Sequence, residues 1–433
     1  MILVFLLFAL FPHATGIACQ RGLTAVNDQK CLMMNKMELK HLWAENSCAQ
    51  YGGTLVPIKN AVDNRAVANM AASAGATNIW IGIFCFATGN TTTCYHDDGS
   101  GTISYNNFAS GNPAVQNGGC VYMSVTGQSA GQWVSGNCEV SLPFVCESPT
   151  TVADPSCKLN YNGYCYLRSH EIPSTSNITT FTKAQAICQA NGGFLLSLHS
   201  KPEIDYVRNI YKNTRYSSIF LGAQKFLPNT FDWDDESNWD YDYTDPLSKT
   251  KGDCLLMTLP SFKDQTAGLW SRTNCSFKYP FMCKRKILEP TAVRSLKPVQ
   301  LKETSIEKTV YHSQKNLPHR QELVDFSNCN TTLYMAPGTI TSYGYPNIKP
   351  PVTYCTWTVA TLGPYQLGVY FTDFSVSKSV YLYDEHGNQL GNPSGNQSPF
   401  RVLGPSNIVK ITHDSSYDAV YGYHGFSATL LPF

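Results

Sequence analysis

One long segment of this chain occurs twice, and cysteines mark both copies. CAQYGGTL at residues 48–55 matches CQANGGFL at 188–195. GQWVSGNC at residues 131–138 matches GLWSRTNC at 268–275, with Gly, Trp, Asn and Cys in register. A repeat unit of this length is a whole domain rather than one layer of a solenoid. The sequence therefore predicts two tandem domains of the same fold.

The N-terminus opens with an apolar run, MILVFLLFALF, which small residues follow. Gly16 and Ala18 occupy the positions that signal peptidase prefers if the chain is cut before Cys19. We therefore expect residues 1–18 to be a signal peptide and the mature protein to be secreted and extracellular. The sixteen cysteines would then be paired, because secreted proteins fold in an oxidising compartment.

Charge and hydropathy argue against two kinds of partner. The 433-residue chain has a formal net charge of +1 and no large block of one sign, whereas nucleic-acid binders usually carry a basic stripe. No segment after the N-terminus has the ~18 uncharged apolar residues of a membrane span. The sequence predicts no nucleic-acid partner and no membrane span.

Each copy has the same coarse layout of a cysteine-bounded hairpin, two helices, short strands and a long turn-rich loop. Leu39, Leu42 and Trp43 have the spacing of an apolar helix face in the first copy, and residues 181–188 show the same pattern in the second. Gly-Gly pairs follow both helices and should end them. SKPE at residues 200–203 is typical of a helix N-terminus, with Pro near the first turn.

Together these motifs resemble the C-type lectin-like domain. The resemblance rests on W-I-G, on C-x2-[YN]-G-G-x-L at a helix end, on the D-G-S loop and on G-x-W-x3-N-C-x7-C, and it covers nearly all of residues 19–285. It implies two such domains, at residues 19–148 and 156–285. It also implies most of the disulfides, and one further pair, Cys85–Cys94, follows by elimination. The implied pairs are Cys19–Cys31, Cys48–Cys146, Cys120–Cys138, Cys157–Cys165, Cys188–Cys283 and Cys254–Cys275.

The chain changes character after the second copy. Residues 286–325 lack cysteine and are rich in Lys, Glu and Pro, which predicts a linker. Residues 326–433 have the alternation and turns of β-strands, and GTITSYGYP followed by YCTWTV resembles the opening of a CUB domain. That resemblance implies a Cys329–Cys355 disulfide. The expected fold is α+β: two tandem C-type lectin-like domains followed by an all-β CUB-like sandwich, rich in disulfides. This order resembles a secreted lectin-like family of nematodes.

Sugar-binding members of the lectin family hold one Ca²⁺, which contacts two sugar hydroxyls. The resemblance places its ligands in a Glu-Pro-Asn or Gln-Pro-Asp tripeptide, in a Glu two residues before the inner-loop cysteine, and in Trp-Asn-Asp. The first copy has Asn112-Pro113-Ala114, Gly118, and Val134-Ser135 at these places. It therefore keeps no carboxylate, and Ca²⁺ requires several hard oxygen ligands.

The second copy departs from the calcium pattern in a different way. It has Asp245-Pro246-Leu247, Gly252, and Ser271-Arg272 at the same places. A cation now stands where a carboxylate is expected, so we interpret Arg272 as a replacement for calcium that pairs with Asp245 or Asp253. A side chain that points to solvent is an equally good interpretation of Arg272. The sequence predicts that the standard calcium-dependent sugar site is lost in both copies and that the protein has no cofactor or metal.

One other stretch has the composition of a recognition surface. FDWDDESNWDYDYTDP at residues 231–246 combines acidic and aromatic side chains, which suit sugar rings or a calcium site of another design. Phe231 and Trp233 alternate like a half-buried strand. The predicted ligand-binding residues are Trp239, Tyr241, Tyr243, Asp245 and Arg272.

The sequence argues against an enzyme. GQSAG at residues 127–131 matches the G-x-S-x-G motif around a nucleophilic serine, but it lies in a turn before a strand and not between a strand and a helix. A hydrolase that depends on Ser129 is therefore the least favoured of the alternatives. N-x-[ST] sequons at Asn90, Asn177, Asn330 and Asn396 predict a glycoprotein.

The expected function is binding of glycans or glycoproteins, including those of microbial surfaces in innate immunity. We expect this recognition to be independent of calcium and to use the faces of the long loops. Two alternatives remain open at this stage. One is a calcium-dependent lectin whose ligands do not align, and the other is an adhesion or matrix protein that binds protein partners.

Overall fold

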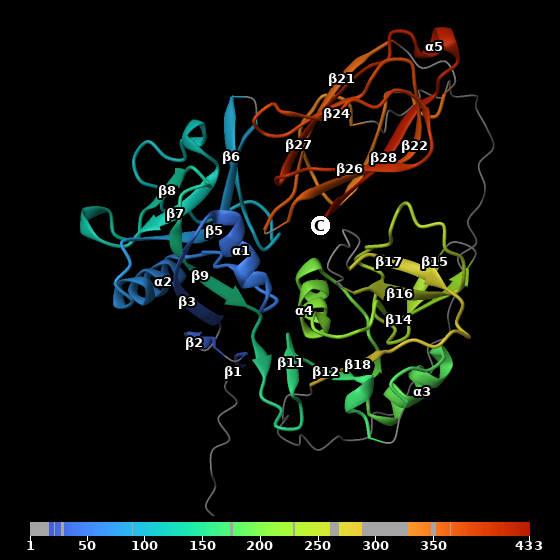
Figure 1. Ribbon diagram of the computed structural model, residues 1–433. Coiled ribbons are helices and arrows are strands. Elements are labelled where there is room, and N and C mark those ends of the chain that lie inside the picture. Colours follow the sequence, from blue (N-terminus) through green and yellow to red (C-terminus); the bar gives the residue numbers. More distant parts are fainter. Residues whose placement is uncertain are drawn as a thin grey trace, which may run out of the picture.

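The computed structural model describes three modules that meet at a common centre, where the C-terminal residues lie (Figure 1). The predicted linker from residue 288 onward and the predicted signal peptide up to residue 16 lie outside the described residues. The described residues are 17–20, 22–26, 30–88, 90–173, 176–227, 230–259, 268–287, 328–347, 352–363 and 365–433.

The first module is an eight-stranded sheet with the order β2-β3-β9-β5-β7-β8, with β4 and β6 at its side, and two helices accompany it. Its apolar core includes Trp133, which is fully buried. Ile17 and Ala18, the last two residues of the predicted signal peptide, form a short pairing with β10. The elements are β1 (Ile17–Ala18), β2 (Thr24–Val26), β3 (Lys30–Leu39), α1 (His41–Ala49), β4 (Thr54–Leu55), α2 (Ala61–Ser73), β5 (Asn78–Thr88), β6 (Thr91–His96), η1 (Val115–Asn117), β7 (Cys120–Ser124), η2 (Gly127–Ser129), β8 (Trp133–Gly136), β9 (Leu142–Ser148) and β10 (Thr151–Val152).

The second module repeats this plan with two four-stranded sheets, β11-β12-β18-β13 and β15-β14-β16-β17. Its second helix begins as predicted, because the Ser200 hydroxyl accepts a hydrogen bond from the backbone N–H of Glu203 and a proline lies in the first turn. The elements are β11 (Leu159–Tyr161), β12 (Tyr164–Arg168), η3 (Ser169–Glu171), α3 (Phe181–Ala190), β13 (Phe194–Leu195), α4 (Lys201–Tyr211), β14 (Ser218–Leu227), β15 (Thr230–Trp233), β16 (Cys254–Thr258), β17 (Trp270–Thr273) and β18 (Met282–Lys286).

The third module is a sandwich of two five-stranded sheets, β19-β21-β27-β23-β24 and β20-β28-β22-β25, with β26 paired to β22. In β21, Cys355, Trp357 and Val359 are buried, whereas the alternate residues Tyr354 and Thr356 are exposed, as the period of a strand requires. The elements are β19 (Thr331–Met335), β20 (Gly338–Thr341), β21 (Tyr354–Ala360), β22 (Leu367–Val376), β23 (Tyr381–Tyr383), β24 (Gln389–Gly391), β25 (Gly395–Gln397), β26 (Phe400–Leu403), β27 (Ile408–Asp414), α5 (Asp418–Tyr421) and β28 (Gly425–Pro432).

In each lectin-like module, one disulfide joins the first helix to a strand near the end of the module. Cys48 and Cys188, near the ends of α1 and α3, bond to Cys146 and Cys283 in β9 and β18. No cysteine is left free, and each pair is the one expected above. The remaining bonds are Cys19–Cys31, Cys85–Cys94, Cys120–Cys138, Cys157–Cys165, Cys254–Cys275 and Cys329–Cys355.

The three modules share apolar cores. Tyr370 and Leu431 of the third module belong to the core of the second, and Ala360 belongs to a core of the first. The first two modules also touch directly, because the Tyr161 hydroxyl donates a hydrogen bond of 2.8 Å to the carbonyl oxygen of Gly52. The third module therefore packs against both of the others. Within the described residues, no helix has the length and apolar character that a membrane crossing needs.

Candidate functional site

Two loops occupy the places where the resemblance to C-type lectin-like domains implies a sugar site. In the first module the loop covers residues 97–119, between β6 and β7, and in the second it covers residues 234–253, between β15 and β16. Each loop lies beside the strand that begins with the buried Trp133 or Trp270. We call them the first and second long loops.

The first long loop is joined to β8 by direct hydrogen bonds. The Asn112 side-chain oxygen accepts hydrogen bonds from the backbone N–H and the hydroxyl of Ser135, at 3.1 and 3.2 Å. The Ser135 hydroxyl accepts in turn from the backbone N–H of Ala114 at 2.6 Å. Ser135 is buried, so the loop and the strand meet here through neutral groups. Two of the positions expected to hold calcium ligands thus bind each other.

Two glycines exclude a further calcium ligand. Gly118 and Gly252 stand two residues before Cys120 and Cys254, where the lectin pattern has glutamate. Their φ angles of 126° and 141° disfavour any other residue. A Cβ atom on Gly118 would lie 2.2 Å from the carbonyl oxygen of Gly136, and one on Gly252 would lie 2.0 Å from that of Thr273. Neither backbone has room for a glutamate.

Arg272 bonds to the backbone of the second long loop. Its Nε donates a hydrogen bond of 2.8 Å to the carbonyl oxygen of Gly252, and its guanidinium lies 5.8 Å from the Phe231 ring centre. Its ion pair with Asp253 is long, at 4.0 Å, and largely exposed, so it contributes little. Asp245 instead accepts a hydrogen bond from the backbone N–H of Leu247. The cation fixes the loop chiefly through a carbonyl and not through the predicted carboxylate pair.

The aromatic residues of the second long loop are packed inward to different degrees. Trp239 is half-buried and stacks on Trp233, with ring centres 4.8 Å apart. Tyr241 is half-buried and lies over Tyr243. Tyr243 is fully buried, and its hydroxyl donates a hydrogen bond of 2.5 Å to the carbonyl oxygen of Pro432. The prediction that Tyr243 is a surface ligand was wrong, because the third module covers it.

The acidic side chains of residues 231–246 do not converge on one point. Asp234 accepts a hydrogen bond from Gln185, Asp235 from Ser197, and Asp240 contacts His199. These three carboxylates therefore already have local partners. In the part of the chain that the structure describes, no three groups of the His, Cys, Asp or Glu type are placed to hold a metal ion.

An open pocket beside the first long loop escaped the sequence analysis. It has a volume of about 570 Å³, within the range of small-molecule sites. Its walls combine hydroxyl and amide side chains with a half-buried Phe108, and no lining side chain carries a charge. The signal in the sequence was only a run of Thr, Asn and Ser. We call it the long-loop pocket, lined by Thr92, Thr93, Cys94, Thr102, Ile103, Asn106, Phe108, Ala109, Ser110, Gly111, Asn112 and Pro113.

The GQSAG segment does not have the geometry of a nucleophilic serine. Residues Gly127–Ser129 form a single 3-10 turn between strands. The Ser129 hydroxyl lies 3.2 Å from the hydroxyl of Ser124. The strand–turn–helix arrangement that exposes such a serine in hydrolases is not formed here.

Comparison with known proteins identifies the modules. The Lectin C-type domain model matches residues 40–148 and 177–285, and the CUB domain model matches residues 329–430. The chain belongs to the C-type lectin domain family. It is a mixed α+β protein with two tandem C-type lectin domains followed by an all-β CUB domain, as predicted. Both are families of recognition domains and not of enzymes.

Similar proteins come from nematodes and vertebrates. C-type lectin domain-containing protein 38 of Caenorhabditis elegans is 36% identical over 279 residues, which cover 64% of this chain and 70% of that protein. Human lymphocyte antigen 75 is 27% identical over 40% of this chain, and human C-type mannose receptor 2 is 23% identical over 57%. The matched regions make up only 10% and 17% of these two receptors.

Solved structures match the chain over about one lectin domain. Human lithostathine is 25% identical and covers 30% of this chain and 98% of its own, with a TM-score of 0.27. A calcium-independent type II antifreeze protein is 21% identical and covers 32% of this chain and 99% of its own, with a TM-score of 0.28.

Proposed function

We propose that this chain is an extracellular recognition protein whose first C-type lectin domain binds neutral glycans in the long-loop pocket without calcium. The observation that carries the proposal is the pocket itself, which lies beside Asn112 and is lined by hydroxyls and amides with no charge. Membership of the C-type lectin family supports a saccharide ligand.

The direct hydrogen bonds between Asn112 and Ser135 support calcium independence. In a calcium-dependent lectin the ion joins loop, strand and sugar, whereas here the loop and strand are already joined. Binding without the ion would use hydrogen bonds to sugar hydroxyls from Thr102, Asn106 and Ser110, all exposed. Phe108 offers an apolar surface for the sugar ring. A few polar groups beside an aromatic wall are the usual composition of small-ligand sites.

The second lectin domain has a different role in this proposal. Its loop aromatics pack on Trp233 and Trp270, and Tyr243 contacts the CUB domain. We therefore assign Tyr243 and the surrounding loop to the assembly of the modules. Trp239 and Tyr241 retain partly exposed faces, and Asp245 and Arg272 stabilise the loop backbone.

The test is a glycan array probed with the full-length protein in calcium and, in parallel, in a chelator. We expect binding to neutral glycans that is equal in both buffers. Binding lost with the chelator would overturn calcium independence. An array with no binding in either buffer would overturn the glycan assignment and favour a protein ligand, as in an adhesion or matrix protein.

Two matched variants place the site. Asn106→Ala removes an exposed amide from the long-loop pocket and should weaken binding about two- to ten-fold, the effect of one hydrogen bond. Asn238→Ala removes an exposed amide from the second long loop and should leave affinity unchanged. Equal affinities for the two variants would place the ligand elsewhere.

We also infer that the protein is secreted and glycosylated and serves innate recognition of microbial surfaces. All of its cysteines are paired, which supports an oxidising compartment. The four predicted sequon asparagines, Asn90, Asn177, Asn330 and Asn396, are exposed. Expression in animal cells should yield secreted protein that an N-glycosidase shortens, and bacterial polysaccharides on the array test the microbial target.

A further inference from the structure

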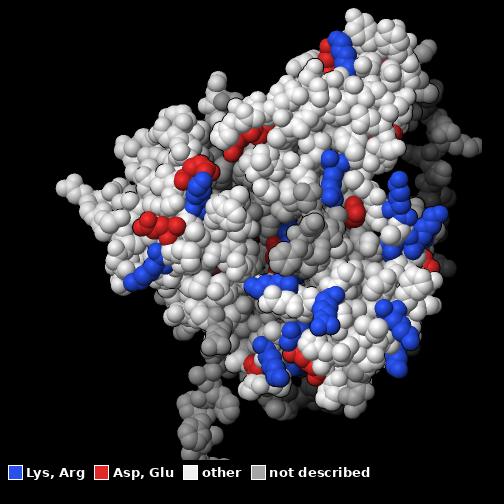
Figure 2. All heavy atoms as spheres, in the orientation of Figure 1, with Lys and Arg blue, Asp and Glu red and all other residues white. Residues whose placement is uncertain are grey.

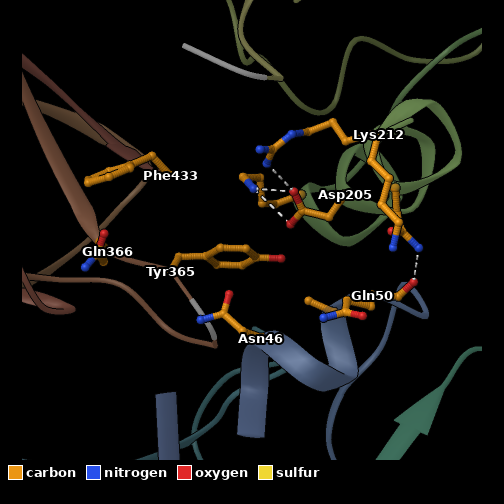
Figure 3. Close-up of a pocket in the computed structure, with 11 residues that line it drawn as sticks. Asn46, Gln50, Asp205, Lys212, Tyr365, Gln366 and Phe433 are labelled. Atoms are coloured by element: carbon orange, nitrogen blue, oxygen red, sulfur yellow. Dashed lines mark hydrogen bonds and ion pairs between the residues drawn. The ribbon is translucent and has the colours of Figure 1, made fainter. Parts of the chain in front are cut away.

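A second pocket lies where the three modules meet, and it shares no lining residue with the long-loop pocket. Figure 3 shows side chains from α1, from α4 and from the CUB domain directed toward one space. The pocket has a volume of about 370 Å³, again in the range of small-ligand sites. We call it the junction pocket, lined by Asn46, Ala49, Gln50, Lys201, Asp205, Arg208, Asn209, Lys212, Tyr365, Gln366 and Phe433.

Helix α4 gives this pocket an excess of positive charge. Lys201, Arg208 and Lys212 line it, and Asp205 is the one acidic side chain of the lining. That carboxylate is already engaged: Lys201 Nζ lies 2.7 and 2.9 Å from its two oxygens, and Arg208 lies 2.8 Å from one of them. The phenol of Tyr365 also hydrogen-bonds to it. Three cationic side chains and one acidic side chain give the lining an excess of positive side-chain charge.

The basic character extends over the surrounding surface. On the face shown in Figure 2, lysine and arginine side chains are more widespread than acidic ones over the second lectin domain. Positive charge in a recessed site attracts anions, because the surrounding protein focuses the electric field there.

Burial makes the positive charges of Lys201 and Arg208 unfavourable unless an anion offsets them. The Lys201 side chain is almost fully buried and lies 4.4 Å from the centre of the Tyr365 ring. Burial lowers its pKa to about 8 even though Asp205 raises it, so the ammonium form still predominates at neutral pH. The Nε atom of Arg208 is buried and has no hydrogen-bond partner among the described residues. Buried donors without partners are unfavourable, so the positive charge of Arg208 is only partly compensated by its bond to Asp205.

Neutral hydrogen-bonding groups from all three modules complete the lining. Asn46 and Gln50 come from α1 and the residue that follows it, Asn209 from α4, and Gln366 from the CUB domain. The amide of Asn209 donates a hydrogen bond of 2.7 Å to the carbonyl oxygen of Gln50, which ties the two lectin domains together at the rim. Amides can both donate to and accept from hydroxyl groups.

We propose that the junction pocket binds an acidic saccharide, that is, a sugar bearing a carboxylate or a sulfate. The acidic group would lie near Arg208 and Lys212, and the hydroxyls would bond to the amides of Asn46, Gln50 and Gln366. Arginine recognises such planar or tetrahedral anions through several N–H groups at once. Because all three modules contribute to the pocket, the site exists only in the docked molecule, and the ligand strengthens that docking.

The experiment measures binding of full-length protein to three oligosaccharides by titration calorimetry: one with glucuronic acid, one sulfated, and one neutral. We expect at least one acidic sugar to bind ten-fold or more tightly than the neutral one, and to bind more weakly as salt rises. The two acidic arms show which anion is preferred. Equal affinities for all three sugars, or no binding of either acidic sugar, would overturn the proposal.

Variants locate the acidic sugar and separate this site from the long-loop pocket. Lys212 is exposed, so Lys212→Glu should leave the fold intact and weaken the acidic sugar at least ten-fold. Lys183→Glu changes an exposed lysine on α3 in the same domain and should have no effect. Asn106→Ala, in the long-loop pocket, should also leave acidic-sugar affinity unchanged. Unaltered binding in Lys212→Glu, or lost binding in Asn106→Ala, would contradict the assignment.

Discussion

Single residues decide the chemistry of the two long loops. Gly118 and Gly252 replace a carboxylate, and they also let the backbone pack against the neighbouring strand at distances that no Cβ atom permits. The first copy then closes its loop with Asn112 and Ser135, and the second with Arg272 on the carbonyl oxygen of Gly252. The loop and the strand are thus joined by neutral hydrogen bonds in the first domain and by a charge-assisted one in the second.

The close packing at Gly252 can be tested by alanine substitution. Gly252→Ala combines left-handed backbone strain with a collision and should lower the free energy of unfolding by about 2–4 kcal/mol. Gly163→Ala is the matched control in the same domain, because Gly163 has a φ of 76° but nothing within 4 Å of an added Cβ. It should cost only about 1 kcal/mol. If urea unfolding shows the same loss of unfolding free energy for both variants, the structure has relieved the collision at residue 252.

Restoring part of the calcium pattern should not restore calcium binding. The double change Ser271→Asn with Arg272→Asp rebuilds Trp-Asn-Asp after the buried Trp270. We expect calcium to leave the thermal unfolding midpoint of this variant unchanged, because Gly252 leaves no room for the glutamate and too few oxygens remain. A rise of several degrees with millimolar calcium would mean that the remaining ligands suffice.

At the scale of the element, the helix patterns were only partly interpreted correctly. In α3 the predicted apolar face is the buried one, with Phe181, Ala184 and Cys188 inside. In α1 the prediction was wrong: Trp43 is 61% exposed, whereas Glu45 is fully buried. The face of α1 that carries Glu45 points inward, because Glu45 forms a buried polar cluster with Asp97 near the CUB domain.

The second helices of the two lectin domains differ at one buried position, where only the first domain bonds to its tryptophan. Asn60 and Ser200 cap α2 and α4, so Asn64 and Ile204 occupy the same place in the two helices. Asn64 accepts a hydrogen bond of 2.8 Å from Trp133 Nε1 and donates one of 3.0 Å to the carbonyl oxygen of Gly131. Trp270 Nε1 has no such partner among the described residues.

Substitutions at this position should therefore have unequal effects. Asn64→Ala leaves the buried indole N–H of Trp133 without an acceptor and should cost about 2–3 kcal/mol of unfolding free energy. Ile204→Val removes only one methyl group and should cost about 1 kcal/mol. Denaturant unfolding followed by tryptophan fluorescence measures both. A loss of under about 0.5 kcal/mol for Asn64→Ala would mean that water replaces the amide.

At the scale of the whole molecule, tyrosine hydroxyls mark where the modules dock. The hydroxyl of Tyr243 bonds to the carbonyl oxygen of Pro432, whereas that of neighbouring Tyr241 is buried without a partner among the described residues. Tyr243→Phe should therefore loosen the CUB domain and increase hydrogen exchange in residues 425–433. Tyr241→Phe should leave that exchange unchanged, because it removes a hydroxyl that bonds to nothing. Equal exchange in both variants would contradict this account of the docking.

The contact between the first lectin domain and the CUB domain contains a buried cluster that titrates. His41, Glu45 and Asp97 are all buried, and the Asp97 carboxylate accepts a hydrogen bond from the backbone N–H of Gly363 in the CUB domain. Burial raises the pKa of Asp97 to about 7, and burial beside Asp97 raises that of Glu45 well above its usual value. Burial lowers the pKa of His41 to about 4. Asp98, next to the cluster, bonds to Lys59 and keeps a lowered pKa.

These shifts predict that stability falls as pH rises from 6.5 to 8. In that window the folded His41 is already neutral, and the carboxyl groups of the unfolded chain have already lost their protons. The folded chain still holds protons on Asp97 and Glu45. The unfolded His41 is partly protonated only near the lower end of the window, at about pH 6.5, so it reduces the fall there without reversing it. Each proton that the folded chain holds and the unfolded chain has lost lowers the free energy of unfolding by up to about 1.4 kcal/mol per pH unit. Asp97→Asn should flatten the fall in thermal midpoint, and Asp98→Asn should not. A midpoint that is flat in the parent protein would contradict the prediction.

The sequence alone determined the class of fold, the number of modules and the cysteine pairs expected for them. These properties depend on patterns that are local in the chain: the repeated Trp, Gly and Cys spacings, the helix ends, and the alternation of strands. The same patterns indicated that the usual calcium ligands are missing. The two tryptophans that the repeat shares, Trp133 and Trp270, are fully buried.

Only the tertiary structure decided which surfaces remain available. Tyr243 and Glu45 have polar side chains of types that are often exposed, yet both are buried where modules pack together. The junction pocket is built from residues that lie far apart in the chain, such as Gln50, Arg208 and Gln366. Whether such residues meet depends on the complementary shape and charge of whole modules, and no local spacing records this. The repeat thus determined each domain, and the docking of the domains determined the sites between them.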